Sequence, residues 1–264
     1  MPKPTIVLVT GSFAPPGFYD NILEIITQRG YEIKALQLTT VAPKAGPRKG
    51  PAATMYDDAA LIAKEIEALA DEGKDVILLS HSYGGIPASQ STKGLTKKER
   101  QEQGKKGGVV RFLYKTALVP ALGKSSTDLL SQQPQSNHID FGVDENGYLY
   151  YVDPSAVADS VFSDIPDRAE RIVCVNKFEV HSAVSFTNEL THAGYKDAPV
   201  SYLLCEEDET ILPKFQRLGI DTIERESGNK VDVTSIKAGH CPTVTKPQEV
   251  VDWILRETAR HEDI

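Results

Sequence analysis

Four short, predominantly apolar runs restrict the fold of this chain more than any other feature. They occupy residues 5–9, 75–79, 109–118 and 200–205. Runs of this length, each ended by small or polar residues, are typical of strands buried on both faces of a parallel sheet. Two further strands are predicted at residues 31–38 and 231–236.

Amphipathic helical patterns lie between these runs. At residues 20–29, 57–70 and 248–259 the apolar side chains recur at helical spacing. Strands that alternate with helices predict an α/β fold with a mostly parallel, doubly wound sheet and helices on both faces. A chain of 264 residues suits one large domain, so residues 1–264 are expected to form a single domain.

The composition excludes several classes of protein. The net charge of −8 argues against general binding to nucleic acid or to an anionic membrane surface. No apolar run is long enough to span a membrane, and the N-terminus lacks the features of a signal peptide. The three cysteines form no closely spaced pair, so we expect neither a metal site nor a disulfide framework, no cofactor, and a reducing, cytoplasmic location.

Two segments interrupt the alternation of strands and helices. Residues 93–108 are polar and basic, and without interleaved aromatic residues they are expected to form a solvated surface excursion. Residues 120–195 contain several short helix-like pieces and the turn sequence DENGY. A long insertion at the carboxyl edge of a sheet is where a helical cap over a pocket would lie.

The stretch VILLSHSYGG, residues 76–85, has the pattern of a nucleophile elbow. In such an elbow a serine lies on a strained turn between a strand and a helix, flanked by small residues because the two elements pass closely. Ser82 is therefore the candidate nucleophile. Ser80 stands where the commonest form of the motif has glycine.

A serine nucleophile needs a base that removes its proton, and the base needs a carboxylate that orients it. His240 follows the last predicted strand, at the same sheet edge as Ser82, and is the candidate base. His81 is adjacent to Ser82 in the sequence and is expected to point away as a packing residue. Candidate carboxylates follow the preceding strand at Glu206, Glu207 and Asp208.

Acyl transfer also needs backbone N–H groups that stabilise a negatively charged oxygen. The amide of Tyr83, directly after Ser82, is one expected donor. The second is expected from the loop after the first strand, where Gly11 allows a tight turn. Ser12 is the predicted donor, with Phe13 next in order, and Gly11 and Phe13 are expected to contact the substrate.

Together these segments resemble the α/β-hydrolase group that contains plant methyl esterases, hydroxynitrile lyases and small fungal or bacterial esterases. The resemblance rests on IVLVTGSFAPPGFYDNI, VILLSHSYGGIPAS, VSYLLCEEDETILPKFQ and AGHCPTVTKPQEVVDWI. It implies an α/β-hydrolase fold with Ser82 as nucleophile, His240 as base and Asp208 as acid, with Glu206 as the alternative acid.

The chain also departs from that group at informative places. The usual His-Gly that opens the first loop is Thr10-Gly11 here. Members that act as hydroxynitrile lyases carry threonine in place of Gly11 and lysine in place of Cys241. Without that cation the resemblance favours hydrolysis over cyanide release.

The sequence therefore predicts a serine hydrolase that cleaves a small ester or lactone through an acyl-enzyme. One alternative is a non-hydrolytic tailoring enzyme, such as a cyclase or lyase, that uses the same three residues. Another is a ligand receptor in which these residues are silent. In each case the expected partner is a small molecule, and the oligomeric state stays open.

Overall fold

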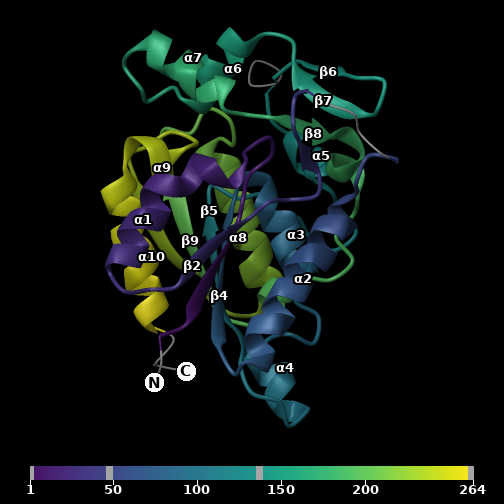
Figure 1. The fold of residues 1–264 in the computed structure, drawn as a ribbon, viewed down its shortest axis with the longest axis vertical. Coiled ribbons are helices and arrows are strands. Elements are labelled where there is room, and N and C mark those ends of the chain that lie inside the picture. Colours follow the sequence, from purple (N-terminus) through teal and green to yellow (C-terminus); the bar gives the residue numbers. More distant parts are fainter. Residues whose placement is uncertain (1–2, 46–49, 135–138, 261–264) are drawn as a thin grey trace.

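The computed structural model describes residues 3–45, 50–134 and 139–260. A six-stranded sheet forms its centre, made of β1 (Thr5–Val9), β2 (Ile33–Leu36), β4 (Asp75–His81), β5 (Gly108–Lys115), β9 (Val200–Cys205) and β10 (Asp232–Ile236). The strands lie in the order β10-β9-β5-β4-β1-β2, and every neighbouring pair is parallel (Figure 1). The predicted parallel sheet is confirmed.

Burial along the strands explains why their sequences are continuously apolar. Every residue of β1, β5 and β9 is buried, because helices cover both faces of the sheet. The strands at the two sheet edges, β2 and β10, alternate between more and less buried residues. At β2 the strand is shorter than the expected 31–38, and β10 begins one residue later than the expected 231.

Helices on the two faces hold this sheet in place. They are α1 (Asp20–Gln28), α2 (Met55–Asp71), α3 (Gly85–Gln90), α8 (Pro213–Ser227), α9 (Pro242–Thr245) and α10 (Pro247–Ala259). The core on one face includes buried residues of α2, α3 and α8, and the core on the other includes those of α1 and α10. The sheet is therefore doubly wound, as the sequence predicts.

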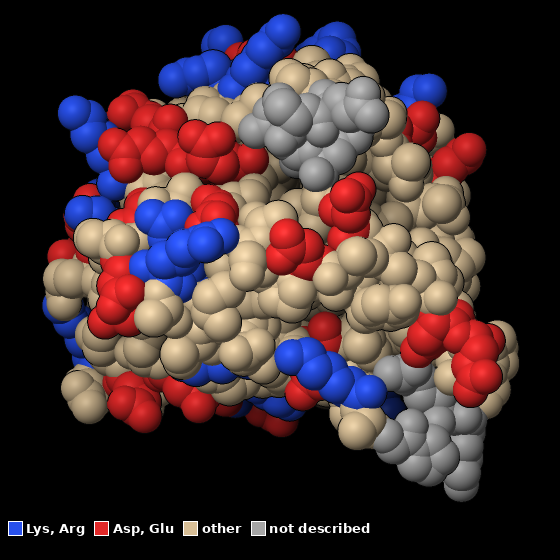
Figure 2. Space-filling view, turned by 90° about the horizontal axis from the view of Figure 1, so that it is seen from above, with Lys and Arg blue, Asp and Glu red and all other residues tan. Residues whose placement is uncertain are grey.

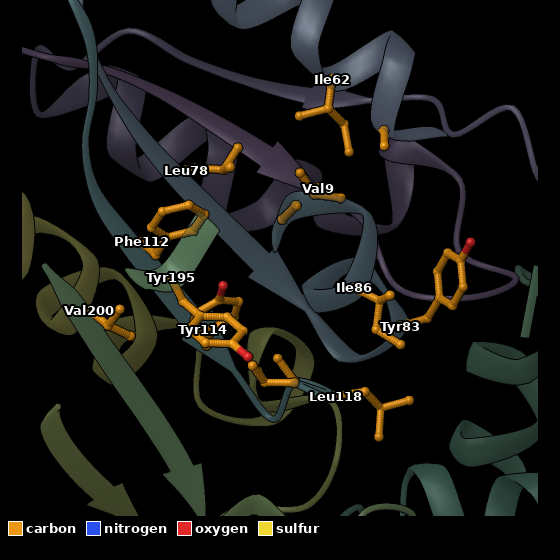
Figure 3. Packing of buried hydrophobic residues seen from close by; sticks show 14 of the residues in the cluster. Val9, Ile62, Leu78, Tyr83, Ile86, Phe112, Tyr114, Leu118, Tyr195 and Val200 are labelled. Carbon is orange, nitrogen blue, oxygen red and sulfur yellow. The ribbon is translucent and has the colours of Figure 1, made fainter. Parts of the chain in front are cut away.

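The close-packed core on the first face positions the strand that ends at Ser82. Ile62 of α2 and Ile86 of α3 belong to the same buried cluster as Val9 of β1 and Leu78 of β4 (Figure 3). Each of these four side chains is fully buried. Interiors packed to this degree leave little freedom for a backbone shift, so the end of β4 is held rigidly.

The segment between β5 and β9 lies beyond the carboxyl ends of the strands (Figure 1). It contains α5 (Ser126–Leu130), α6 (Pro154–Val161), α7 (Arg168–Asn176), β6 (Phe141–Val143), β7 (Tyr148–Tyr151) and β8 (Val180–Ser182). The three strands join β3 (Val41–Ala42) in an antiparallel sheet of order β3-β8-β7-β6. The helical pieces were expected, but these strands were not, because each has only three or four residues. The predicted turn DENGY joins β6 to β7.

The expectation for residues 93–108 holds in part. Residues 101–106 are exposed, as expected of a solvated excursion, but the segment also forms α4 (Lys97–Glu102), which begins with a capping box between Thr96 and Glu99. Arg100 is only 2% exposed and its guanidinium lies 2.6 Å from the Asp71 carboxylate. The long stem of an arginine can cover apolar surface while its head group is paired, so a basic run does not by itself indicate a solvated face.

The strand expected at 109–118 ends early, at Lys115. Thr116 has a positive φ of 42°, which no extended strand accommodates. The chain then turns so that the Leu118 amide donates a hydrogen bond of 3.0 Å to the Ser82 carbonyl oxygen. This turn supports the loop that carries Ser82.

Acidic and basic side chains are interspersed over the face that carries the insertion, with uncharged residues between them (Figure 2). Among the described residues, no helix is both long enough and apolar enough to cross a membrane. In the same part of the chain, no group of three His, Cys, Asp or Glu side chains is placed to hold a metal ion. Cys174, Cys205 and Cys241 are all free thiols.

Candidate active site

Ser82 lies at the sharp turn between β4 and α3. Its φ of 55° lies in the left-handed region that is costly for a side chain other than glycine. The turn is held because the chain passes very close to its neighbours. A Cβ on Gly84 would lie 2.5 Å from the Thr10 carbonyl oxygen, and one on Gly85 would lie 2.5 Å from that of Leu118. The two glycines of the motif are therefore required by space.

His240 and Asp208 meet Ser82 at the carboxyl edge of the sheet. Nε2 of His240 lies 3.0 Å from Oγ of Ser82, and Nδ1 of His240 lies 2.9 Å from Oδ2 of Asp208. A carboxylate can only accept here, so Nδ1 carries the hydrogen and the lone pair of Nε2 faces the serine hydroxyl. All three residues are buried: Ser82 is 7% exposed, His240 is 5% exposed and Asp208 is 1% exposed.

The carboxylate of Asp208 is held in place by donors on both oxygens. Oδ1 accepts hydrogen bonds from the amides of Thr210 and Ile211, each at 2.8 Å. Oδ2 accepts from Nε2 of Gln216 at 3.1 Å as well as from His240. Glu206, the alternative acid, is exposed. The structure thus places Asp208, and not Glu206, beside the histidine.

The loop that follows β1 brings Ser12 to the same site. Phe13 has a positive φ of 62° and is held by two contacts with the insertion. Its carbonyl oxygen accepts from the Glu179 amide at 2.7 Å, and its amide points to Nδ1 of His181 at 3.4 Å. Among the described residues the Ser12 amide has no hydrogen-bond partner, and Ser12 lines the same cavity as Ser82.

Tyr83 is the other expected amide donor, and its side chain is fully buried in the cluster that also contains Ile86 (Figure 3). Its hydroxyl donates to Oδ2 of Asp58 at 3.1 Å. Thr40 donates two further hydrogen bonds to that carboxylate, from its amide at 3.0 Å and from its hydroxyl at 2.6 Å. The buried side chain therefore anchors the residue whose amide follows the nucleophile.

A family model agrees with this geometry. The model of the alpha/beta hydrolase family matches residues 6–253, nearly the whole chain. The chain belongs to the alpha/beta hydrolase family. The fold class and the family resemblance predicted from the motifs are both confirmed.

Individual relatives of this α/β-hydrolase include named hydrolases. It is 35% identical to "Probable hydrolase R7" from Phoma sp., over 96% of this chain and 98% of that protein. It is 24% identical to "Methylesterase 9" from Arabidopsis thaliana, over 95% of this chain and 96% of that protein. The solved pyrethroid hydrolase from Sphingobium faniae superposes with a TM-score of 0.73 at 22% identity, over 99% of each chain. The last comparison shows the shared fold.

A cavity of about 490 Å³ lies above Ser82 and His240 in this α/β-hydrolase. Aromatic and aliphatic side chains from the first loop, the insertion and the loops after β5 and β9 form most of its wall: Phe13, Leu118, Leu130, Ile139, Phe141, Leu149, Tyr151, Val161, Phe178, Phe186 and Ile211. Hydroxyl-bearing residues such as Thr127, Ser131 and Thr187 complete it. Among the described residues, no Asp, Glu, Lys or Arg lines the cavity. The predicted contact residues Gly11 and Phe13 both line it.

Burial holds four titratable side chains at or near the cavity neutral: His81, Tyr151, His181 and Cys241. Burial lowers the pKa of His181 to about 3, so its imidazole is uncharged. Burial, the neighbouring Lys115 and His240 also lower the pKa of His81 well below its ordinary value. Burial raises the pKa of the Tyr151 hydroxyl and of the Cys241 thiol, which keeps both protonated. The cavity is therefore both apolar and uncharged.

Sequence reasoning missed several residues that support the site. Asp58 had a readable signal, because it lies four residues before Ile62 and eight before Ile66, on the buried face of α2. Its burial raises the pKa of its carboxyl to about 6. His181 and Tyr19 had no local signal, since their partners are distant in the sequence. His81 was expected to be a packing residue, but both of its ring nitrogens also make hydrogen bonds, with Tyr19 and with the His240 carbonyl oxygen.

Proposed function

We propose that this α/β-hydrolase is a serine hydrolase that cleaves an uncharged, largely apolar ester or lactone. The observation that carries the proposal is the pair of contacts from Ser82 Oγ to His240 Nε2 and from His240 Nδ1 to Asp208. Ser82 and His240 both line the apolar cavity. The same arrangement of hydroxyl, imidazole and carboxylate performs acyl transfer on unrelated folds.

In the proposed first step, the Ser82 hydroxyl transfers its proton to Nε2 of His240 as Oγ bonds to the substrate carbonyl carbon. Asp208 stabilises the resulting imidazolium through the hydrogen on Nδ1. The imidazolium then donates the Nε2 proton to the leaving alcohol oxygen, and the carbon–oxygen bond breaks. The product of this half-reaction is an ester between the acyl group and Ser82.

The second half-reaction uses the same groups in reverse. His240 accepts a proton from a water molecule, whose oxygen bonds to the acyl carbon. The proton then returns to Ser82 Oγ as the bond between serine and carbonyl carbon breaks. A lactone follows the same steps, except that the alcohol and the acid leave as one molecule.

The negative oxygen that develops in both steps needs donors that are already in place. We assign this role to the amides of Ser12 and Tyr83. The contacts of Phe13 with Glu179 and His181 support the assignment, because they fix the loop that presents Ser12. Removal of one such donor typically costs about a hundredfold to a thousandfold in kcat.

The cavity supports an uncharged substrate. Burying a carboxylate or ammonium group without a partner costs roughly several kcal/mol. A single hydrogen bond stabilises by less than this. Three hydroxyls at the cavity wall already donate their hydrogens to the backbone carbonyls of Phe186, Asp128 and Val184. They can only accept from a ligand, so they suit a hydroxyl group on the substrate and do not suit a carboxylate. The insertion that carries them serves, in this proposal, as a cap.

Lyase chemistry of the cyanide-releasing kind has less support. A leaving cyanide needs a cation beside the histidine, and the residue after His240 is Cys241, whose thiol is buried and protonated. Hydrolysis needs no such cation. Other non-hydrolytic reactions of the same three residues are separated from hydrolysis by the experiment below.

The test is a panel of activated short-chain, aromatic and lactone substrates, each neutral ester paired with an analogue that carries a terminal carboxylate. We expect the wild type to cleave neutral members, Ser82→Ala to lose about 10⁴-fold or more in kcat, and the carboxylate analogues to react at least tenfold more slowly. With ¹⁸O-labelled water, the acid product should gain one solvent oxygen. Ser82→Ala at wild-type rate, no labelling of the wild type by a fluorophosphonate, or product without solvent oxygen would each contradict the proposal.

A further inference from the structure

A buried chain of hydrogen bonds passes beneath the candidate site and joins two of its loops. The amide of Gly11 lies 2.9 Å from the hydroxyl oxygen of Tyr19. The same oxygen lies 2.8 Å from Nδ1 of His81, and Nε2 of His81 lies 2.9 Å from the carbonyl oxygen of His240. Tyr19 is fully buried and His81 is 3% exposed.

The chemistry of these groups allows only one direction for the hydrogens. A carbonyl oxygen can only accept, so Nε2 of His81 carries a hydrogen and donates it to His240. In a neutral imidazole Nδ1 then accepts, and the only hydrogen available to it is that of the Tyr19 hydroxyl. The Tyr19 oxygen in turn accepts from the Gly11 amide. The chain is therefore fully satisfied only when His81 is neutral.

The surroundings of His81 keep it neutral. Three titratable side chains face it: Tyr19, the fully buried Lys115 on the adjacent strand, and His240, while Cys241 adjoins Tyr19. Burial and the Lys115 amine lower the pKa of His81, while burial raises that of Tyr19. Each group in the chain thus keeps one protonation state, and the direction of donation is stable.

Both ends of the chain adjoin groups that the proposed reaction uses. Gly11 immediately precedes Ser12, the proposed amide donor, and packs closely against His81 and Ser82. A Cβ on Gly11 would lie 3.1 Å from Nδ1 of His81 and 3.3 Å from Cβ of Ser82. At the other end, the His240 carbonyl oxygen also accepts from Oγ1 of Thr116 at 3.2 Å, so the backbone of the base is held from two sides.

We propose that Tyr19 and His81 are positioning residues that set the distance between the Ser12 amide and the His240 imidazole. They touch neither the serine hydroxyl nor the substrate carbonyl in the proposed reaction. They act by tying the loop after β1 to the loop after β10 through one directed chain. The inference rests on the proposed hydrolysis, and it adds residues that the nucleophile, base and acid pattern does not contain.

The test is Tyr19→Phe, which removes one oxygen and keeps the ring. Its matched control is Tyr114→Phe, because Tyr114 is also fully buried and its hydroxyl also makes a side-chain hydrogen bond, with Ser89 at 2.8 Å, but in the core on the other face of the sheet. For a neutral ester that the wild type cleaves, we expect Tyr19→Phe to lower kcat about ten- to hundredfold, since small displacements of reacting groups cost this much. KM should stay within about threefold, and Tyr114→Phe should change neither constant by more than about threefold.

A second measurement separates positioning from a merely structural role. The Ki of a trifluoromethyl ketone, which forms a tetrahedral adduct with the serine, should rise in parallel with the loss of kcat/KM, because both depend on the transition-state geometry. His81→Gln, which keeps a donor at the position of Nε2, should retain more activity than His81→Leu. These two variants carry the test if Tyr19→Phe does not fold.

The outcomes distinguish this inference from the proposed function. If the wild type hydrolyses no member of the ester panel, the proposed function fails. If the wild type is active and Tyr19→Phe matches Tyr114→Phe in kcat and in Ki, the inference fails while the function stands. Equal activity of His81→Gln and His81→Leu overturns it as well.

Discussion

At the scale of single residues, the most unusual side chain beneath the site is Lys115. It is fully buried, and its Nζ makes no hydrogen bond within the described residues. Its Nζ lies 5.3 Å from the centroid of the Tyr19 ring. Burial lowers the pKa of the Lys115 amine from 10.5 to about 7. The folded protein therefore carries an amine that the unfolded chain would protonate more readily.

This burial predicts that Lys115→Met stabilises the protein. Methionine fills the same space without an unpaired polar group, so the free energy of unfolding should rise by about 1–3 kcal/mol at pH 7. Between pH 7 and 10.5 the unfolded chain binds the proton that the folded chain has lost, so wild-type stability rises with pH in that window. The advantage of Lys115→Met should accordingly shrink from pH 7 to pH 10.

Urea unfolding, followed by the fluorescence of Trp253, measures both effects. Trp253 is the single tryptophan and is 1% exposed. Lys105→Met is the control, because Lys105 is exposed and should contribute little. A Lys115→Met variant that is no more stable than wild type at pH 7 would show that the amine has a favourable partner.

At the scale of elements, the insertion is hydrogen-bonded to the loop that carries His240. Asp164, between α6 and α7, accepts through Oδ2 from the Gly239 amide at 2.7 Å and from the Thr245 hydroxyl at 2.6 Å. These two residues flank His240 and Cys241 in the sequence. In the proposed mechanism, these two hydrogen bonds would orient His240.

Asp164→Ala should remove both hydrogen bonds between the insertion and this loop. Two donors lose a charged acceptor, so we expect a loss of about 1–3 kcal/mol in the free energy of unfolding. We also expect kcat for a cleaved ester to fall about tenfold or more, because the base is less well placed. Asp159→Ala is the control: Asp159 lies in the same insertion and pairs with Arg168 and Arg171, away from His240. Equal kcat in the two variants would refute a positioning role for Asp164.

At the scale of the whole molecule, one apolar core joins the insertion to the sheet. Phe162 of the insertion is fully buried, and its ring centroid lies 6.1 Å from that of Phe18 in the first loop. Both belong to the buried cluster that contains Ile6 of β1 and Trp253 of α10. A shared core of this kind predicts that residues of the insertion and of the sheet unfold together, as a single domain.

Phe162→Ala tests this cooperativity. Loss of a fully buried phenyl ring should lower the free energy of unfolding by about 3–5 kcal/mol. Because Trp253 lies in the sheet-covering helix, its fluorescence transition should shift by the same amount as the transition followed by circular dichroism. Val173→Ala, at a site 58% exposed on α7, should shift neither. An unshifted Trp253 transition in Phe162→Ala would indicate that the insertion unfolds on its own.

The sequence by itself determined the parts of this protein that depend on neighbours along the chain. Continuous apolar runs identified the buried parallel strands, because burial on both faces leaves no polar alternation. Gly84 and Gly85 marked the turn at Ser82, because the strand and helix pass too closely there for any Cβ. The loops of Asp208 and His240 follow adjacent strands, and parallel strands end at one edge of the sheet. The shared edge therefore predicted that Ser82 and His240 lie on one side of the sheet with an acid from residues 206–208, and the family resemblance selected Asp208.

Tertiary structure decided how those residues are held. His181 is 168 residues from Phe13, His81 is 62 from Tyr19, and Asp164 is 75 from Gly239. A hydrogen bond between such distant residues leaves no spacing or periodicity in the sequence, since neither partner constrains the residues beside it. The ion pair between Arg100 of α4 and the distant Asp71 was not predicted for the same reason. The strands of the insertion were not predicted because they are too short to show alternation. Local pattern specifies which groups can react, and only the folded contacts fix the geometry in which they do so.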